Sequence, residues 1–294
     1  MDEGLIENVS DTAFWVAHYR GVETRRSDAL FRDPLAGMLA GDRGKKIAQK
    51  MPLPAMTAWV IAIRTCIIDE YIGRAIGEGI DTVINLGAGL DARPYRMDVP
   101  SSLLWIEADY PHMIEFKETR LAKEQPRCRL ERVKIDLANL VERRRWLADV
   151  DARAKRLLIL TEGVVPYLSV EEAGSLADDL KVLRHSGYWV VDYLSPEAIK
   201  FRESCGMERK TRNAPFKFAP ADWFGFFRGH GWRLKEMRYF AEEAERLKRP
   251  LRLPVVMMAT SAIRTLFASR ERRSAYRKLA GYAILEPEGA AAIS

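Results

Sequence analysis

Cysteine and histidine are scarce in this sequence, and neither occurs in the spacing of a metal site. The three cysteines, Cys66, Cys128 and Cys205, lie far apart without a C-x-x-C pair, so neither a disulfide framework nor a zinc knuckle is predicted. The four histidines are scattered and include no H-E-x-x-H motif, so we expect no metal ion. Unpaired cysteines fit a reducing cytoplasm, which is the location we expect.

A long hydrophobic run is also missing. The longest apolar stretch, VVMMATSAIRTLFA, is interrupted by Arg264 and is too short to span a bilayer. The first fifteen residues carry acids and no apolar segment of the kind found in signal peptides. We therefore expect an untargeted, soluble protein without a membrane partner.

The charge has no strong bias toward one sign. The formal net charge is +6 over 294 residues, and basic residues alternate with acids. The exceptions are three basic runs, ERRRW (142–146), RLKRPLRL (246–253) and SRERRSAYRK (269–278). We expect these runs to be solvated helix faces rather than nucleic-acid contacts, while guidance of an acidic substrate stays an alternative.

What the sequence does contain is a regular alternation of short apolar runs and longer helical stretches. An apolar fraction of 48% is enough for a substantial core, and we expect one elaborated domain over 1–294. Near-continuous apolar strands separated by helices predict a doubly wound α/β core with a mostly parallel sheet. The seven expected strands are 82–88, 103–109, 130–136, 156–163, 188–194, 233–240 and 281–287.

Around this core the sequence suggests additional segments. Residues 1–80 have helical character and predict a cap, 81–194 form the ligand-binding core, and 233–294 complete it with the last strands and a helix. Residues 195–232 form an insertion rich in aromatics, which could close over a substrate or simply pack on the surface. The clearest helix is 169–187, with Ser169 and Glu172 as a capping box and Gly187 as its C-cap.

The stretch DTVINLGAGLDARPYRMD, 81–98, contains a glycine turn directly after the first strand. Gly87, Gly89 and Ala92 match the G-x-G-x-x-A pattern of dinucleotide sites. A pyrophosphate, however, needs the N-terminus of a long helix, where Asp91 would repel it and Pro94 shortens the helix. A cationic ligand without phosphates, such as S-adenosylmethionine, fits this turn better.

Acids at the ends of the other strands suit the same ligand, because ligands bind beyond the carboxyl ends of parallel strands. Asp109 or Glu107 could accept the ribose hydroxyls, and Asp136 the adenine amino group. Glu162 and Arg64 could bind the ammonium and carboxylate of a methionine. Individually, each acid could equally be a helix cap or a loop residue, and Arg64 a surface residue.

Five segments of the sequence together resemble the leucine carboxyl methyltransferase family of S-adenosylmethionine-dependent enzymes. More closely, they resemble its bacterial polyketide-type O-methyltransferases, which implies a role in secondary metabolism. The similarity covers roughly residues 10–195. The segments are RTCIIDEYI, VINLGAGLDARPYRMD, IEADYPHMIEFK, VKIDL and LTEGVVPYLSVEEA.

This resemblance implies a seven-stranded, Rossmann-like class I methyltransferase sheet and assigns roles to individual residues. Most of the assigned residues bind the cofactor, and Tyr167 faces the methyl acceptor. The cofactor residues it implies are Arg20 and Arg64, the turn Gly87, Ala88 and Gly89, Asp109 for the ribose, Asp136 and Leu137 for the adenine, and Glu162 near the amino end.

A carboxylate acceptor is already ionised at neutral pH, so its methylation needs no general base. We therefore expect methylation of a carboxylate or other acidic oxygen on a small metabolite, with Arg64 and Tyr167 orienting the acceptor. Two alternatives stay open from the sequence. One is an NAD(P)-dependent oxidoreductase that uses the glycine turn, and the other is an RNA-directed protein with the same fold.

Overall fold

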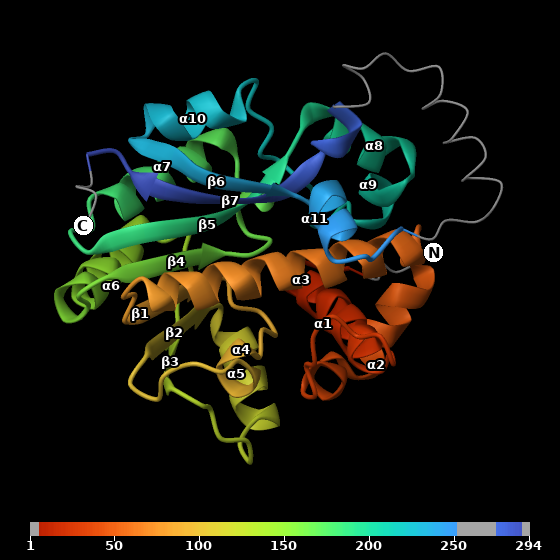
Figure 1. Ribbon diagram of the computed structural model, residues 1–294, viewed down its shortest axis with the longest axis horizontal. Coiled ribbons are helices and arrows are strands. Elements are labelled where there is room, and N and C mark those ends of the chain that lie inside the picture. The colour runs from red at the N-terminus through yellow and green to blue at the C-terminus, as the bar shows by residue number, and fades with distance from the viewer. Residues whose placement is uncertain (1–5, 252–274, 290–294) are drawn as a thin grey trace.

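A computed structural model describes residues 6–251 and 275–289 of the chain (Figure 1). Its centre is a seven-stranded sheet in the order β3-β2-β1-β4-β5-β7-β6. The strands are β1 Thr82–Leu86, β2 Leu104–Asp109, β3 Arg129–Lys134, β4 Leu157–Thr161, β5 Ser186–Leu194, β6 Trp232–Tyr239 and β7 Ala280–Pro287.

The first five strands are parallel, and β7 runs antiparallel between β5 and β6. The mostly parallel sheet and all seven expected strands are thus confirmed. Strand β1 lies between β2 and β4, so the chain leaves it in one direction and later returns to its other side. Such a switch point opens a crevice at the carboxyl ends of the strands.

Helices cover both faces of the sheet, as Figure 1 shows. The helices are α1 Ser10–Thr24, α2 Ala36–Lys50, α3 Pro54–Gly77, α4 Arg93–Arg96, α5 Pro111–Arg120, α6 Leu140–Arg153, α7 Val170–Lys181, α8 Pro196–Ser204, α9 Met207–Lys210, α10 Trp223–Gly229 and α11 Phe240–Arg246, with a short 3₁₀ turn at Val165–Tyr167.

The pleat of the strands divides the core into two layers. Ile84 packs in one layer with residues of α6, α7 and α10, whereas the adjacent Val83 packs in the other with α3 and α11. Neighbouring side chains point to opposite faces of a strand, and in a parallel sheet both faces are covered. This is why β1, β2 and β4 are buried at every position.

The N-terminal segment is helical as expected. Helices α1 and α2 gather beyond one end of the sheet, as Figure 1 shows, and pack against each other through a third apolar cluster that includes Phe14 and Ile47. Gly44 of α2 lies so close to α1 that a methyl group on it would be 2.4 Å from the Phe14 carbonyl oxygen. Glycine at this position therefore allows the two helix backbones to touch.

Helix α7 begins as predicted and ends earlier. Ser169 accepts from the Glu172 backbone while the Glu172 side chain accepts from Ser169, which confirms the capping box. The predicted end at Gly187 is wrong, because the helix stops at Lys181 and Gly187 lies in β5. A methyl group on Gly187 would be 3.0 Å from the Leu157 carbonyl oxygen, so this glycine permits close approach to β4.

The insertion at 195–232 contains α8, α9 and α10. Three of its aromatics, Phe218, Trp223 and Phe227, are buried in the main core cluster rather than spread over a cavity. Most of its aromatic surface therefore packs against the sheet. That the insertion closes over a substrate stays a prediction.

No helix within residues 6–251 and 275–289 is both long and apolar enough to cross a membrane. The apolar stretch VVMMATSAIRTLFA and most of the third basic run lie outside the described residues.

Candidate functional site

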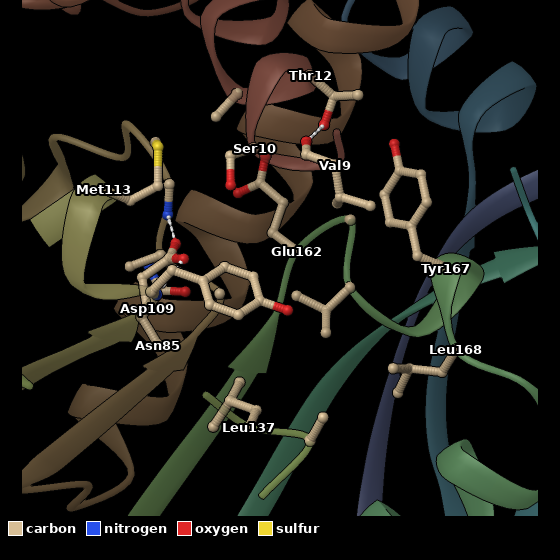
Figure 2. A pocket seen from close by; sticks show the side chains of 18 of the residues that line it. Val9, Ser10, Thr12, Asn85, Asp109, Met113, Leu137, Glu162, Tyr167 and Leu168 are labelled. Atoms are coloured by element: carbon tan, nitrogen blue, oxygen red, sulfur yellow. Dashed lines mark hydrogen bonds between the residues drawn. The ribbon is translucent and has the colours of Figure 1, made fainter. Parts of the chain in front are cut away.

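A cavity of about 630 Å³ lies at the carboxyl ends of β1, β2, β3 and β4. Figure 2 shows Asp109 and Tyr167 on opposite sides of it, with Glu162 between them and Leu137 below. The cavity has the size of a small-molecule site and lies at the predicted switch point.

The glycine turn after β1 forms one wall. Gly87 and Gly89 have φ angles of 65° and 47°, which other residues rarely adopt. Neither position has room for a side chain. A methyl group on Gly87 would lie 2.6 Å from Val164, and one on Gly89 would lie 3.0 Å from Ala13 of α1. Gly87 and the adjacent Ala88 also donate to the Ala108 carbonyl, which holds the turn against β2.

At the end of β2 the structure distinguishes the two candidate acids. Asp109 lines the cavity, and its carboxylate accepts from the backbone N–H groups of Gly89 (2.6 Å) and Tyr110 (2.7 Å). Burial raises its pKa. Glu107 is fully buried and paired with Lys117 at 2.7 Å and Arg132 at 2.9 Å, so it does not face the cavity.

After β3, Leu137 lines the cavity and Asp136 does not. The Asp136 side chain is exposed, and its carboxylate accepts from the backbone of Ala138 at 2.9 Å. It therefore stabilises a local turn before α6. Its assignment to the adenine stays a prediction.

Opposite charges alternate along the floor of the cavity. Arg64 of α3 contacts one oxygen of Glu162 at 2.8 Å, and Arg93 contacts the other at 2.7 Å. Burial alone would raise the pKa of Glu162, but Arg93 and Arg64 outweigh it and the pKa lies below its ordinary value. The Arg64 Nε is buried and has no hydrogen-bond partner within the described chain. Arg64 and Glu162, far apart in sequence, are thus brought together, and their binding of a methionine group stays a prediction.

Asp91 has a different environment from the one we expected. It is buried against Arg93 at 2.9 Å and accepts from Asn85 at 2.9 Å, so its charge is balanced within the protein. The case against a pyrophosphate therefore rests on α4, which spans only Arg93–Arg96. A helix this short offers little of the dipole and few of the free N–H groups that bind phosphate.

Helix α1 forms the roof of the cavity. Arg20 lines it and is held by Asp33 at 2.9 Å and by the carbonyl of Leu90. The other roof residues of this helix escaped the sequence analysis, although their spacing of three and four is that of one helix face. They are Val9, which directly precedes α1, and Ser10, Thr12, Ala13 and Val16.

Tyr167 lies on the opposite side from Asp109, in the turn after β4 (Figure 2). Its ring contacts Phe216 edge-on, with centroids 5.0 Å apart. Burial raises the pKa of its phenol, so the hydroxyl stays protonated and can donate. Next to it, the carbonyl of Pro166 accepts from the backbone of Lys217 at 2.8 Å.

One residue of the two described basic runs differs from the solvated faces we expected, whereas Arg144, Arg145 and Arg246 are exposed. Arg143, in ERRRW, is buried and lines the cavity, where it donates to the Leu137 carbonyl and to Asp179, both at 2.9 Å. Placing it on a solvated face was wrong, because the bulk of α7 covers it. In the second run, the exposed Arg246 contacts Glu70 at 2.6 Å on the surface, and Arg249 pairs with Glu23.

Comparison with known proteins identifies the family. The leucine carboxyl methyltransferase profile matches residues 13–181, more than half of the 294-residue chain. The chain belongs to this family. A provisionally named S-adenosyl-L-methionine-dependent methyltransferase from Mycobacteroides abscessus is 32% identical over 286 residues, covering 84% of this chain and 91% of its own. A similarly named protein from Streptomyces coelicolor is 31% identical over 237 residues, covering 75% of this chain and 82% of its own.

Solved structures share the fold of this leucine carboxyl methyltransferase family member at low sequence identity. A DUF574 protein from Streptomyces avermitilis covers 92% of this chain and 96% of its own, with 14% identity and a TM-score of 0.55. A provisionally named methyltransferase from Thermobifida fusca covers 94% of each chain, with 15% identity and a TM-score of 0.52. The class I methyltransferase fold and the family resemblance are therefore confirmed, and the chain is a methyltransferase rather than an oxidoreductase.

Proposed function

We propose that this S-adenosylmethionine-dependent methyltransferase methylates a carboxylate, or another acidic oxygen, of a small metabolite. The observation that carries the proposal is Tyr167, whose protonated phenol lines the cavity opposite Asp109, and we take this side of the cavity as the acceptor side. No histidine is among the described residues that line this cavity. A donor without a base suits an acceptor that is already ionised.

The residues around the cavity fit the cofactor. The unpartnered Nε of Arg64 is suited to the carboxylate of a methionine group, and Glu162 to its ammonium. Asp109 keeps acceptor capacity for ribose hydroxyls, since each of its oxygens receives only one backbone N–H. The turn at 87–89 and Leu137 would flank the nucleoside, while Arg20 reaches the same cavity from α1.

When bound, S-adenosylmethionine would supply the methyl group: the acceptor oxygen would bond to the methyl carbon as the carbon–sulfur bond breaks and its electron pair returns to sulfur. Arg64 and Tyr167 would hold the acceptor oxygen in line by hydrogen bonds. The α1 roof would limit the access of water to the bound acceptor. No proton has to be moved when the acceptor is a carboxylate.

Asp192 is a further acid near this site, because its carboxylate accepts from the Gly163 backbone at 2.9 Å. It does not line the cavity, and it also receives the hydroxyl of Tyr282. We therefore give it a structural role rather than that of a base. An RNA substrate is less favoured because many of the basic side chains in the described runs are paired with acids.

The test uses matched acceptors. Purified enzyme is incubated with S-adenosylmethionine and a set of aromatic and aliphatic acids, each beside its primary alcohol and amide, and mass spectrometry detects the gain of one methyl group. We expect methylated acids, with a rate that is flat above the pKa of the acceptor carboxyl. Methylation of the alcohols alone, with a rate that rises through a basic pKa, would contradict the proposal. The resemblance to polyketide-type enzymes makes acids of secondary metabolism the first set to try.

A further inference from the structure

The cations that line the cavity are mostly neutralised by the protein itself. Each of the three arginines has a carboxylate of its own within a short distance. The pairs are Arg20 with Asp33 at 2.9 Å, Arg64 with Glu162 at 2.8 Å and Arg143 with Asp179. These pairs offset most of the arginine charge, and the one unpartnered nitrogen, Arg64 Nε, is assigned above to the methionine carboxylate.

Lys217 differs from these arginines. It lines the same cavity, and its ammonium makes no hydrogen bond or ion pair with any residue in the described part of the chain. Its side chain is exposed, so water solvates it when no ligand is bound. It is therefore a cation available to an incoming anion.

The acids that line the cavity have partners other than Lys217. Glu171 accepts from the Ser169 hydroxyl at 2.8 Å, and Glu172 accepts from the Ser169 backbone at 2.7 Å in the capping box. Asp109 lies on the opposite side of the cavity from Tyr167, whereas Lys217 is hydrogen-bonded to the backbone next to Tyr167. The remaining acids on this wall pair with arginines.

The backbone at Lys217 is fixed on both sides. Its N–H donates to the carbonyl of Pro166 at 2.8 Å, directly beside Tyr167. Phe218 is buried in the core, and Phe216 contacts the ring of Tyr167 on one side and the guanidinium of Arg202, at 3.8 Å, on the other. The lysine therefore projects from a rigid segment next to the proposed acceptor side of the cavity.

We propose that Lys217 is a specificity-determining residue that binds the carboxylate of the methyl acceptor. This inference rests on the proposed function, because it places the acceptor beside Tyr167. Methylation converts the acceptor into a neutral ester, which removes the charge that Lys217 attracts. Lys217 thus favours acids as substrates and weakens the binding of the product ester.

The test compares an acid with its own ester. The probes are dansylglycine and dansylglycine methyl ester, whose fluorescence changes on binding, titrated into enzyme saturated with S-adenosylhomocysteine. The variants are Lys217→Gln, which removes the charge, and Lys217→Arg, which keeps it. Lys200→Gln is the matched control, because Lys200 is an exposed lysine of the same insertion that does not line the cavity.

We expect the wild-type enzyme to bind the acid more tightly than the ester. Lys217→Gln should reduce this preference by about fivefold, the size of a partly exposed ion pair, through weaker binding of the acid. Lys217→Arg and Lys200→Gln should stay within about twofold of wild type, and added salt should reduce the wild-type preference. The inference would be overturned if the wild-type enzyme bound acid and ester equally well. It would also be overturned if Lys217→Gln kept the wild-type preference for the acid.

A separate measurement distinguishes failure of this inference from failure of the proposed function. Calorimetry with S-adenosylhomocysteine alone should give the same affinity for all four proteins, because Lys217 lies on the acceptor side. If none of them binds S-adenosylhomocysteine, the proposed function fails. If all bind it and the acid preference does not depend on Lys217, only this inference fails.

Discussion

At the scale of the single residue, Glu162 contacts two arginines, Arg64 in the cavity lining and the buried Arg93 behind it. Each of its oxygens accepts from a different guanidinium, Arg64 on one side and Arg93 on the other. All three side chains are largely withdrawn from water, where an unpaired charge is costly. We therefore expect Glu162 both to bind the methionine group and to stabilise the folded protein.

Replacing Glu162 by Gln should accordingly lower both properties. The change removes the carboxylate that pairs with buried Arg64 and one of the three that surround Arg93, so we expect the free energy of unfolding to fall by about 3 kcal/mol in urea titrations. S-adenosylhomocysteine affinity should fall as well, by calorimetry at a temperature where the variant is folded. Glu171→Gln, at an exposed acid near the mouth of the cavity, is the control and should change stability little. An unchanged unfolding free energy for Glu162→Gln would contradict this account.

Asp192 should make stability depend on pH in the direction opposite to most acids. Burial raises its pKa to about 6, against which the hydrogen bond from Tyr282 and the charge of Arg64 act. A raised pKa means that the folded protein binds the proton more tightly than the unfolded chain. Its contribution to stability is therefore largest at low pH and is lost as pH rises from about 4 to about 6.

The measurement compares wild type with Asp192→Asn by urea unfolding between pH 4 and pH 7. Because other groups titrate alike in both proteins, the difference isolates Asp192. Relative to wild type, the variant should gain about 3 kcal/mol over this interval. If the difference in unfolding free energy between the two proteins stays constant over this pH range, or changes in the opposite direction, the pKa of Asp192 is not raised.

At the scale of the element, the contact between α1 and α2 depends on a residue without a side chain. Gly44 brings the two backbones together, and α1 in turn forms the roof of the cavity. The capping box of α7 is a second local device, and it also holds Glu171 and Glu172 at the cavity rim. Helices α1 and α7, which both contribute to the cavity lining, are thus positioned by the contact at Gly44 and by the capping box.

Gly44→Ala should therefore destabilise the protein although alanine is the better helix former. The added methyl would meet the Phe14 carbonyl at 2.4 Å, and we expect a loss of about 1–3 kcal/mol. Gly73→Ala is the matched control, because Gly73 also lies inside a helix and nothing is within 4 Å of its added methyl. That variant should be as stable as wild type or about 0.5–1 kcal/mol more stable. Similar effects of both changes on thermal unfolding would argue against the close helix contact.

At the scale of the whole molecule, the cavity joins parts of the chain that are distant in sequence. Its lining comes from α1, α3, the turns after four strands and the insertion. A ligand bound there contacts all of them at once and is absent from the unfolded chain. Binding should consequently stabilise the entire fold.

S-adenosylhomocysteine at about 100 times its Kd should add about 2.7 kcal/mol of stability and raise Tm by several degrees. NADP at the same concentration should not, since α4 is too short to provide a pyrophosphate site. Differential scanning fluorimetry measures both shifts. A larger shift with NADP than with S-adenosylhomocysteine would contradict the assignment of the cavity.

Much of this architecture could be predicted before any contact was seen. Strand positions followed from runs of apolar residues, the start of α7 from Ser169 and Glu172, and the turn after β1 from its glycines. These are local properties, encoded within a few adjacent residues. Because parallel strands end at one edge of a sheet, the cavity wall at Asp109 and Glu162 could be predicted as well.

Tertiary structure decided which neighbouring residues face the cavity. Asp109 lines it while Glu107 is buried beneath, and Arg143 and Lys217 line it although no sequence motif marks them. Gly187 belongs to a strand rather than to a helix end, because its surroundings come from β4. The physical reason is that burial and charge pairing depend on groups many residues away, whose approach is set only when helices and sheet pack together.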